Sequence, residues 1–243
     1  MKDTLFTLVS NKRIAKNTYE WQLEGDISDI TASGQFVNIK LDGFYLRRPI
    51  SVCDAACGRL TLIFKVVGDG TEKMAAAKEG EQFLTLTGLG NGYDLTKAGD
   101  RPLLLGGGAG IPPMYMLAKK LIAMGKTPTV ILGFNTAEEI FYKEEFEALG
   151  LKVLITTADG SVGIKGFVTD AMRECDYTYF FTCGPEPMLK AVYNASLTSG
   201  QFSFEERMGC GFGACMGCSC KTKYGNKRIC RDGPVLEKEE IIW

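Results

Sequence analysis

The sequence predicts a multi-domain protein of β and α/β architecture, with an antiparallel β-barrel, a parallel sheet covered by helices, and a small cysteine-rich module. Three observations predict this arrangement. Residues 1–98 contain short apolar or alternating runs separated by turn residues, and residues 99–200 alternate strand-like with helix-like segments. Residues 201–243 hold five of the nine cysteines. We therefore expect three domains with these boundaries.

The bulk composition is that of an ordinary globular chain. Its 243 residues suffice for about two domains and a short third one. Hydrophobic residues make up 45% of the sequence and charged residues 23%. A net charge of −1 gives no general attraction to nucleic acid or to an anionic membrane. No run of about 18 apolar residues and no apolar leader is present, so we expect a cytoplasmic protein.

The cysteine and histidine contents restrict the chemistry. An odd number of cysteines, crowded near one end, does not resemble a secreted disulfide framework and indicates a reducing compartment with a metal centre. The chain has no histidine, which excludes Ser-His-Asp and Cys-His catalysis and every histidine-ligated metal. The chemistry must run through a bound cofactor or through Cys, Asp, Glu, Lys, Tyr or Ser. We assign no catalytic residue.

The first hundred residues predict a small antiparallel barrel, because six strand-like segments alternate with Gly- and Asp-containing turns. The expected strands are Leu5–Val9, Thr18–Leu23, Phe36–Leu41, Ile50–Cys53, Leu60–Val66 and Phe83–Thr87. One helix-like piece, Thr71–Lys78, interrupts them.

Two stretches of this barrel suit a diphosphate. Arg48 offers a planar fork to phosphate oxygens, and Pro49 stiffens the approach to it. Gly70 and Thr71 open the helix-like piece, whose first N–H groups favour an anion. Ser51 supplies a hydroxyl for a heterocycle. The alternative is a surface arginine pair beside a turn.

The next hundred residues predict a parallel sheet with both faces covered, because uninterrupted apolar strands alternate with helices. The expected strands are Leu103–Leu105, Val130–Gly133, Leu151–Thr156 and Tyr179–Cys183, and the expected helices are Pro113–Met124, Tyr142–Leu149, Val168–Cys175 and Met188–Leu197.

A glycine-rich turn, Gly106–Pro113, joins the first of these strands to its helix and is suited to a dinucleotide diphosphate. It is not the Rossmann G-x-G-x-x-G pattern, because Pro113 stands where a later small residue is expected. After the second strand, Glu138 and Glu139 occur where a 2′-phosphate would require an arginine, so we expect NAD and not NADP. Cys183 ends the fourth strand and has a simpler reading as a buried small residue.

Four cysteines near the end of the chain, Cys210, Cys215, Cys218 and Cys230, follow the C-x4-C-x2-C…C spacing of a plant-type [2Fe–2S] loop. Small residues separate the first three, as a backbone wrapped closely around a cluster requires. A structural zinc site is the alternative, although zinc sites usually present two separated C-x2-C pairs. Cys220 is a packed or spare thiol, or else an alternative ligand. About forty residues are too few for a separate ferredoxin domain, so we expect this module to lean on a neighbouring surface.

The motifs together resemble the ferredoxin–NAD(P)H reductase superfamily: Arg-Pro-Ile-Ser followed by Gly-Thr, the GGGxGIxP pattern, and Cys-Gly-Pro at residues 183–185. This resemblance implies FAD in the domain 1–98 and NAD in the domain 99–200. The residues implied at FAD are Arg48, Pro49, Ile50, Ser51, Ile63, Phe64, Lys65, Gly70 and Thr71. Those implied at NAD are Gly107, Gly108, Ala109, Gly110, Cys183, Gly184 and Pro185.

With the segment Glu205–Cys218 included, the whole chain resembles the electron-transfer subunits of class 1B dihydroorotate dehydrogenases. That resemblance implies one [2Fe–2S] cluster on the four cysteines of the module 201–243. It also implies a heterotetramer, two of each subunit, with an FMN-containing catalytic subunit that oxidises dihydroorotate in pyrimidine biosynthesis.

The physical order of the carriers agrees with this resemblance. NAD⁺ takes two electrons as a hydride whereas a cluster passes them singly, so a flavin belongs between them. Two alternatives stay open at this point. One is a reductase-type subunit of an electron-bifurcating or sulfide-linked complex, and the other is a zinc-stabilised interaction module without enzymatic activity.

Overall fold

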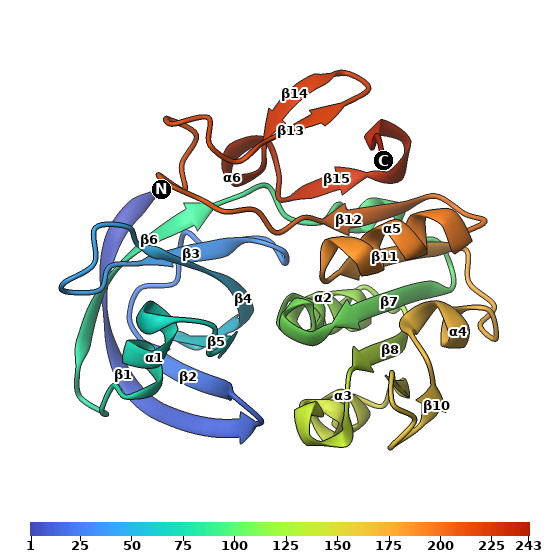
Figure 1. Ribbon diagram of the computed structural model, residues 1–243, viewed down its shortest axis with the longest axis horizontal. Coiled ribbons are helices and arrows are strands. Elements are labelled where there is room, and N and C mark those ends of the chain that lie inside the picture. Colours follow the sequence, from blue (N-terminus) through green and yellow to red (C-terminus); the bar gives the residue numbers. More distant parts are fainter.

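The computed structural model describes all residues, Met1–Trp243, and its two larger sheets lie side by side (Figure 1). The first is a closed antiparallel barrel in the order β1-β2-β5-β4-β3-β6, which confirms the predicted barrel. Its strands are β1 (Lys2–Ala15), β2 (Thr18–Glu24), β3 (Phe36–Ile39), β4 (Arg48–Ala56), β5 (Arg59–Lys65) and β6 (Gln82–Leu89). Helix α1 (Asp69–Ala75) connects β5 to β6.

Alternation of side chains along β3 decides what each face of this strand contacts. Val37 and Ile39 are fully buried in the barrel core with Trp21. Phe36 belongs instead to an apolar cluster outside the barrel, and by the two-residue period of a strand Asn38 points the same way. The outer face of β3 is therefore turned toward the rest of the molecule.

The second sheet has seven strands in the order β10-β9-β8-β7-β11-β12-β15. All neighbouring pairs from β10 to β12 are parallel, and β15 runs antiparallel to β12 at the edge. Its strands are β7 (Pro102–Gly107), β8 (Thr129–Phe134), β9 (Lys152–Thr157), β10 (Ile164–Lys165), β11 (Tyr179–Cys183), β12 (Gly200–Ser203) and β15 (Val235–Glu237).

Helices cover both faces of this sheet, as the apolar strands predict. Side chains of α2 and α3 pack with one set of sheet residues, and side chains of α4 and α5 pack with the other set. The helices are α2 (Pro112–Ala123), α3 (Lys143–Ala148), α4 (Val168–Met172) and α5 (Glu186–Ala195), and the single 3₁₀ turns are η1 (Leu95–Lys97), η2 (Gly108–Gly110), η3 (Ala137–Glu139) and η4 (Lys238–Glu240).

A small hairpin follows the cysteine loop near the end of the chain. The hairpin is formed by β13 (Ser219–Thr222) and β14 (Gly225–Arg228) alone. Cys230 follows on the short helix α6 (Ile229–Asp232), and β15 leaves the hairpin to pair with β12. Val235 and Leu236 are buried there, so pairing at the sheet edge removes more apolar surface from water than the hairpin offers.

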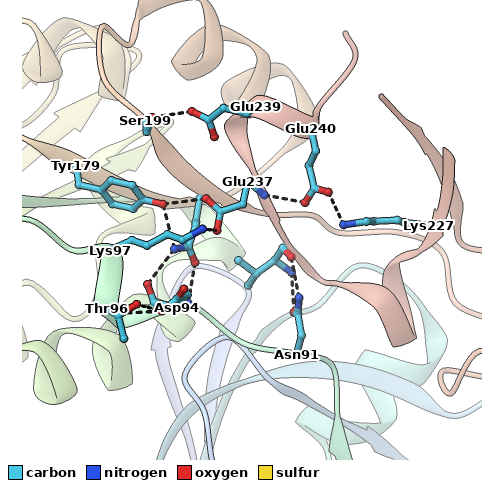
Figure 2. Close-up of polar contacts among 12 residues, drawn as sticks. Asn91, Asp94, Thr96, Lys97, Tyr179, Ser199, Lys227, Glu237, Glu239 and Glu240 are labelled. Carbon is cyan, nitrogen blue, oxygen red and sulfur yellow. Dashed lines mark hydrogen bonds and ion pairs between the residues drawn. The ribbon is translucent and has the colours of Figure 1, made fainter. Parts of the chain in front are cut away.

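This C-terminal segment packs on the junction between the two sheets, as its shortness predicts (Figure 2). The Asn91 side chain takes the place of a strand neighbour for Val235, since its Nδ2 donates to the Val235 carbonyl at 2.8 Å and its Oδ1 accepts from the Val235 N–H at 3.1 Å. Glu237 accepts from Lys97 at 2.8 Å and from the Tyr179 hydroxyl at 3.0 Å. The connection between the barrel and the sheet is thereby tied to β15.

None of the helices combines the length and the apolar character that crossing a bilayer requires.

Candidate functional site

A cavity of about 280 Å³ opens where the barrel, the second sheet and the segment after β12 meet. Eleven of the predicted cofactor-binding residues line it: Arg48, Pro49, Ile50, Ser51, Ile63, Phe64, Lys65, Thr71, Ala109, Gly110 and Cys183. The structure thus brings residues from β4, β5 and α1 together with residues that follow β7 and end β11.

The other five predicted residues lie next to this cavity. Gly70 contacts Arg48, and Gly108 borders a narrow adjoining space that shares Ile63–Lys65 and Ala109 with the cavity. Gly107, Gly184 and Pro185 surround one side chain, that of Met188 on α5: a Cβ on Gly107 would lie 2.3 Å from the Met188 sulfur and 3.5 Å from Pro185. All the predicted positions therefore belong to one region.

Arg48 is the first residue of β4, and it places a positive charge in the barrel wall of the cavity. Its guanidinium lies 4.4 Å from the ring centroid of Phe44 and forms no ion pair with a carboxylate. Gly70 allows close packing here, because a Cβ at that position would lie 2.0 Å from the Arg48 Nε. The Thr71 hydroxyl donates to the Gly68 carbonyl at 2.8 Å and fixes the turn. The guanidinium also donates to the Leu46 carbonyl, and because it has no carboxylate partner it is suited to a diphosphate.

The sheet contributes the other wall at the point where its strand order reverses. β7 is followed in the chain by β8 on one side, whereas β11 lies on its other side, and ligands of open α/β sheets bind at the carboxyl ends of such strands. Gly110 follows β7, and Cys183 ends β11. A Cβ on Gly110 would lie 2.2 Å from the Cys183 carbonyl oxygen, so glycine is required for the two loops to meet.

The Cys183 thiol is neutral at this position. It is buried, and burial raises its pKa to about 12; the neighbouring Glu205 charge adds to this effect, while a hydrogen bond with Ser203 opposes it. A neutral, small and polarisable side chain can pack against a heterocycle without acting as a nucleophile. This environment agrees with the absence of a predicted catalytic residue.

The four cysteines of the predicted cluster form two pairs. Cys210 Sγ accepts hydrogen bonds from the N–H groups of Ala214 at 3.2 Å and Cys215 at 3.4 Å, and its thiol also contacts that of Cys215. Cys218 Sγ accepts from the Cys230 N–H at 3.4 Å, and these two thiols are also in contact. No three side chains of the kinds that bind metals converge on a single point. Two pairs suit a two-iron cluster better than one tetrahedral ion.

The environment of these thiols also fits a metal cluster. Burial opposes ionisation of Cys210, but backbone N–H groups of the loop, led by that of Cys215, outweigh it and lower its pKa to about 6. Burial, together with the adjacent Cys218 thiol, raises the pKa of Cys230 to about 12. The loop therefore favours the thiolate form of Cys210, whereas the Cys230 thiol needs an added positive charge nearby in order to ionise at neutral pH.

Cys220 stands apart from both pairs. It lies half-buried on β13 and lines a separate cavity of about 200 Å³ together with Phe204 and Trp243. Burial raises the pKa of this thiol. Its surroundings are those of a packed side chain.

The segment from Ser203 to Met208 lines the main cavity and was not among the predicted site residues. It follows β12, whose carboxyl end lies at the same edge of the sheet as that of β11. The position of a segment after a parallel strand is the only sequence signal that points to it. Cys210 comes two residues after Met208, so the cavity and the cysteine loop are neighbours in the chain.

The two predicted acidic residues after β8 lie on η3, facing the barrel. The Lys16 ammonium donates to Glu138 at 2.7 Å, and the Lys65 ammonium donates to Glu139 at 2.9 Å. Burial opposes the charged form of Glu139, but its hydrogen bonds with Lys65 and Asn135 outweigh this and lower its pKa. The Glu139 carboxylate is therefore charged at neutral pH.

Comparison with known proteins identifies the family. The iron-sulfur cluster binding domain of dihydroorotate dehydrogenase B matches residues 205–242, and the oxidoreductase NAD-binding domain matches residues 104–194. A dihydroorotate dehydrogenase B (NAD(+)) electron transfer subunit from Fusobacterium nucleatum subsp. nucleatum is 44% identical over 252 residues, covering 97% of this chain and 96% of that protein. The Bacillus pumilus subunit of the same name is 42% identical, covering 99% and 98%.

Solved structures agree on the fold. The NADH-dependent reduced ferredoxin-NADP oxidoreductase, studied for flavin-based electron bifurcation, superposes with a TM-score of 0.90 at 31% identity over 98% of this chain and 90% of that one. A ferredoxin NADP⁺ reductase from Neisseria gonorrhoeae with bound FAD and NADP has a TM-score of 0.71 at 17% identity, over 80% and 90% of the two chains. From the full-length identity to the curated subunits, the chain belongs to the family of dihydroorotate dehydrogenase B electron transfer subunits.

Proposed function

We propose that this chain connects an FMN-containing, dihydroorotate-oxidising subunit with NAD⁺ by way of a [2Fe–2S] cluster and FAD. The observation that carries the proposal is the adjacency of the two sites: the segment that closes the cavity runs directly into the cysteine loop. One polypeptide thus holds a cavity of about 280 Å³ next to four paired thiols.

The barrel residues are proposed to hold FAD. Arg48 and the Gly70-Thr71 turn face its diphosphate, and Pro49–Ser51 and Ile63–Lys65 line the cavity around its ring. FAD, when bound, exchanges a hydride with NAD⁺ and single electrons with an iron–sulfur cluster. The chain contributes position, apolar walls and the exclusion of water, and no side chain acts as a general base.

The sheet residues are proposed to hold NAD. The N–H groups of Gly107–Gly110 precede α2 and face the diphosphate, while Cys183–Pro185 lie beside the nicotinamide. The neutral Cys183 thiol closes that end of the cavity. Glu138 and Glu139 lie at the carboxyl end of β8, on the side of the adenosine ribose.

The cysteines are proposed to bind one iron per pair, Cys210 with Cys215 and Cys218 with Cys230. The three proposed domains are 1–98 for FAD, 99–200 for NAD and 201–243 for the cluster. We further propose a heterotetramer of two copies of this chain with two FMN-containing catalytic subunits, acting in the cytoplasm in pyrimidine biosynthesis.

The proposal is tested by anaerobic purification of the chain together with the dihydroorotate-oxidising subunit that is encoded in the same genome. We expect FAD, about two irons per chain and acid-labile sulfide, together with NAD⁺-dependent oxidation of dihydroorotate. The catalytic subunit alone should retain dihydroorotate oxidation with an artificial acceptor but lose NAD⁺ reduction.

Two results would contradict the proposal. Zinc in place of iron and sulfide would support the interaction-module alternative. Reduction of ferredoxin by NADH, without any dihydroorotate-dependent reduction of NAD⁺, would favour the electron-bifurcating class to which the solved relative belongs.

A second prediction concerns the nucleotide. We expect NADH to reduce the flavin with a kcat/KM at least about 100-fold above that of NADPH, because a 2′-phosphate beside two carboxylates costs about 3 kcal/mol. The Glu138→Gln variant should reduce this preference, since it removes one exposed negative charge together with its ion pair to Lys16. Steady-state reduction of a dye by each nucleotide measures the ratio, and equal use of both by the wild-type protein would refute the assignment.

A further inference from the structure

One polar side chain of the barrel bridges the two proposed cofactor sites. Asn38 lies on β3, directly opposite Pro49 of β4 in the antiparallel register, and the neighbouring pair joins Ile39 to Arg48. The strand that carries the Arg-Pro-Ile-Ser motif is therefore the immediate neighbour of Asn38. In Figure 1 the segment that leads from β12 to the cysteine loop passes next to β3.

The Asn38 side chain also contacts the cysteine loop, which lies far from it in the sequence. Its Nδ2 donates a hydrogen bond to the Cys210 carbonyl at 3.3 Å, across 172 positions of the chain. The next residue, Gly211, adopts φ of +77°, and a Cβ there would lie 2.4 Å from the Asn38 Nδ2. Glycine is thus needed at this point both for the backbone conformation and for the close approach of Asn38.

Asn38 is an unfavourable residue for stability alone. It is 1% exposed, and its Oδ1 is buried without any hydrogen-bond partner. A buried amide oxygen left unpaired costs free energy that an apolar side chain of the same shape would avoid. Its sequence neighbours on β3 are both apolar. The hydrogen bond from its Nδ2 to the Cys210 carbonyl therefore explains why the one polar residue of β3 is Asn38.

A second residue on the same face of β3, Phe36, lies between the main cavity and the cysteine module. Phe36 lines the main cavity and belongs to the apolar cluster that contains Cys218 and Cys230. The outer face of β3 thus borders the cavity through Phe36 and contacts the start of the cysteine loop through Asn38. It forms the shared wall between the proposed flavin and cluster sites.

We propose that Asn38 is a positioning residue for electron transfer, which holds the Cys210 end of the cysteine loop at a fixed place against the flavin-binding strand. This inference rests on the proposed function. Asn38 touches neither reacting group; it acts through the Cys210 carbonyl. Its loss should change the distance and orientation between the two carriers and leave each of them bound.

The test uses the full-length holoprotein with its catalytic subunit and two variants, Asn38→Ala and Asn38→Leu. Leucine keeps the number and branching of the side-chain heavy atoms of asparagine and removes both the unpaired oxygen and the hydrogen bond to Cys210, so Asn38→Leu should melt close to the wild-type temperature. Stopped-flow absorbance after mixing with NADH follows flavin reduction and then cluster reduction. We expect flavin reduction within twofold of wild type and cluster reduction slower by about tenfold or more. The electron paramagnetic resonance spectrum of the reduced cluster should also change.

Asn11→Leu is the matched control. Asn11 is also a barrel asparagine with a buried, unpartnered Oδ1, and its Nδ2 also donates to carbonyls, those of Ala75 and Ala77. It does not line the cavity. We expect this variant to transfer electrons to the cluster at the wild-type rate with an unchanged resonance spectrum.

The proposal is overturned if Asn38→Leu reduces its cluster at the wild-type rate with an unchanged spectrum. It is also overturned if Asn38→Leu melts well below wild type and loses FAD and iron together, because Asn38 would then be a stabilising core residue. Failure of the proposed function has a different signature, since the wild-type protein itself would lack flavin or iron–sulfur absorbance.

Discussion

Replacing Cys215 by serine should reduce dihydroorotate-dependent NAD⁺ reduction to background while NADH still reduces the flavin. A serine hydroxyl ionises far less readily than a thiol and offers iron oxygen in place of sulfur, so the iron proposed at Cys210 and Cys215 is held less well. Cys215 is exposed, and its removal leaves the apolar core intact. Iron analysis, coupled activity in the complex, and anaerobic flavin reduction by NADH measure the separate parts of this expectation.

Cys57→Ser is the control for that variant. Cys57 is likewise exposed, but it lies in the turn between β4 and β5, away from the cysteine loop. It should keep full coupled activity and full iron content. Full coupled activity in Cys215→Ser would remove the cluster from the electron route.

Gly110→Ala should abolish nucleotide use and destabilise the protein. The new Cβ would lie 2.2 Å from the Cys183 carbonyl oxygen and 2.5 Å from the Gly184 nitrogen, and both are backbone atoms that cannot move aside. We expect a loss of about 3 kcal/mol in the free energy of unfolding, as for severe overpacking. The displaced loops should lower flavin reduction by NADH at least about 100-fold. Denaturant unfolding and stopped-flow absorbance measure the two effects.

Gly125→Ala separates the clash from the general cost of adding a methyl group. Gly125 ends α2 with φ of +76° and has open space around the position of a Cβ. It should cost about 1 kcal/mol through backbone strain alone and leave flavin reduction by NADH unchanged. Wild-type reduction by NADH in Gly110→Ala would show that the contact between the two loops does not shape the nucleotide site.

The sequence predicted the architecture well because its patterns are local. Turn residues and alternating runs marked each barrel strand, and apolar runs marked the strands of the parallel sheet. The ends of elements were less well predicted: β1 extends from Lys2 to Ala15, although only Leu5–Val9 has the expected pattern. Its second half is half-exposed and polar, and backbone pairing with β2 keeps it extended without an apolar signature.

Contacts between distant parts of the chain were beyond this kind of prediction. The motifs located Arg48, Gly110 and Cys183, because each lies in a short pattern with its own physical reason. No local pattern indicates that β15 pairs with β12, that the segment from Ser203 to Met208 closes the cavity, or that Asn38 reaches Cys210. These depend on how two sheets pack, which the spacing of residues along one strand does not encode.

The attachment of the cysteine module has a consequence for how the protein acquires its metal. Ser203 and Val235 are partners in the ladder between β12 and β15, and the Phe204 N–H donates to the Pro234 carbonyl at 2.9 Å. The segment of about thirty residues between them leaves the sheet edge and returns to it at the same place, so strand pairing holds its two ends together. Because both ends of this segment are held at one place, we expect it to open locally while the barrel and the parallel sheet stay folded. Metal could then be loaded after the rest of the chain has folded.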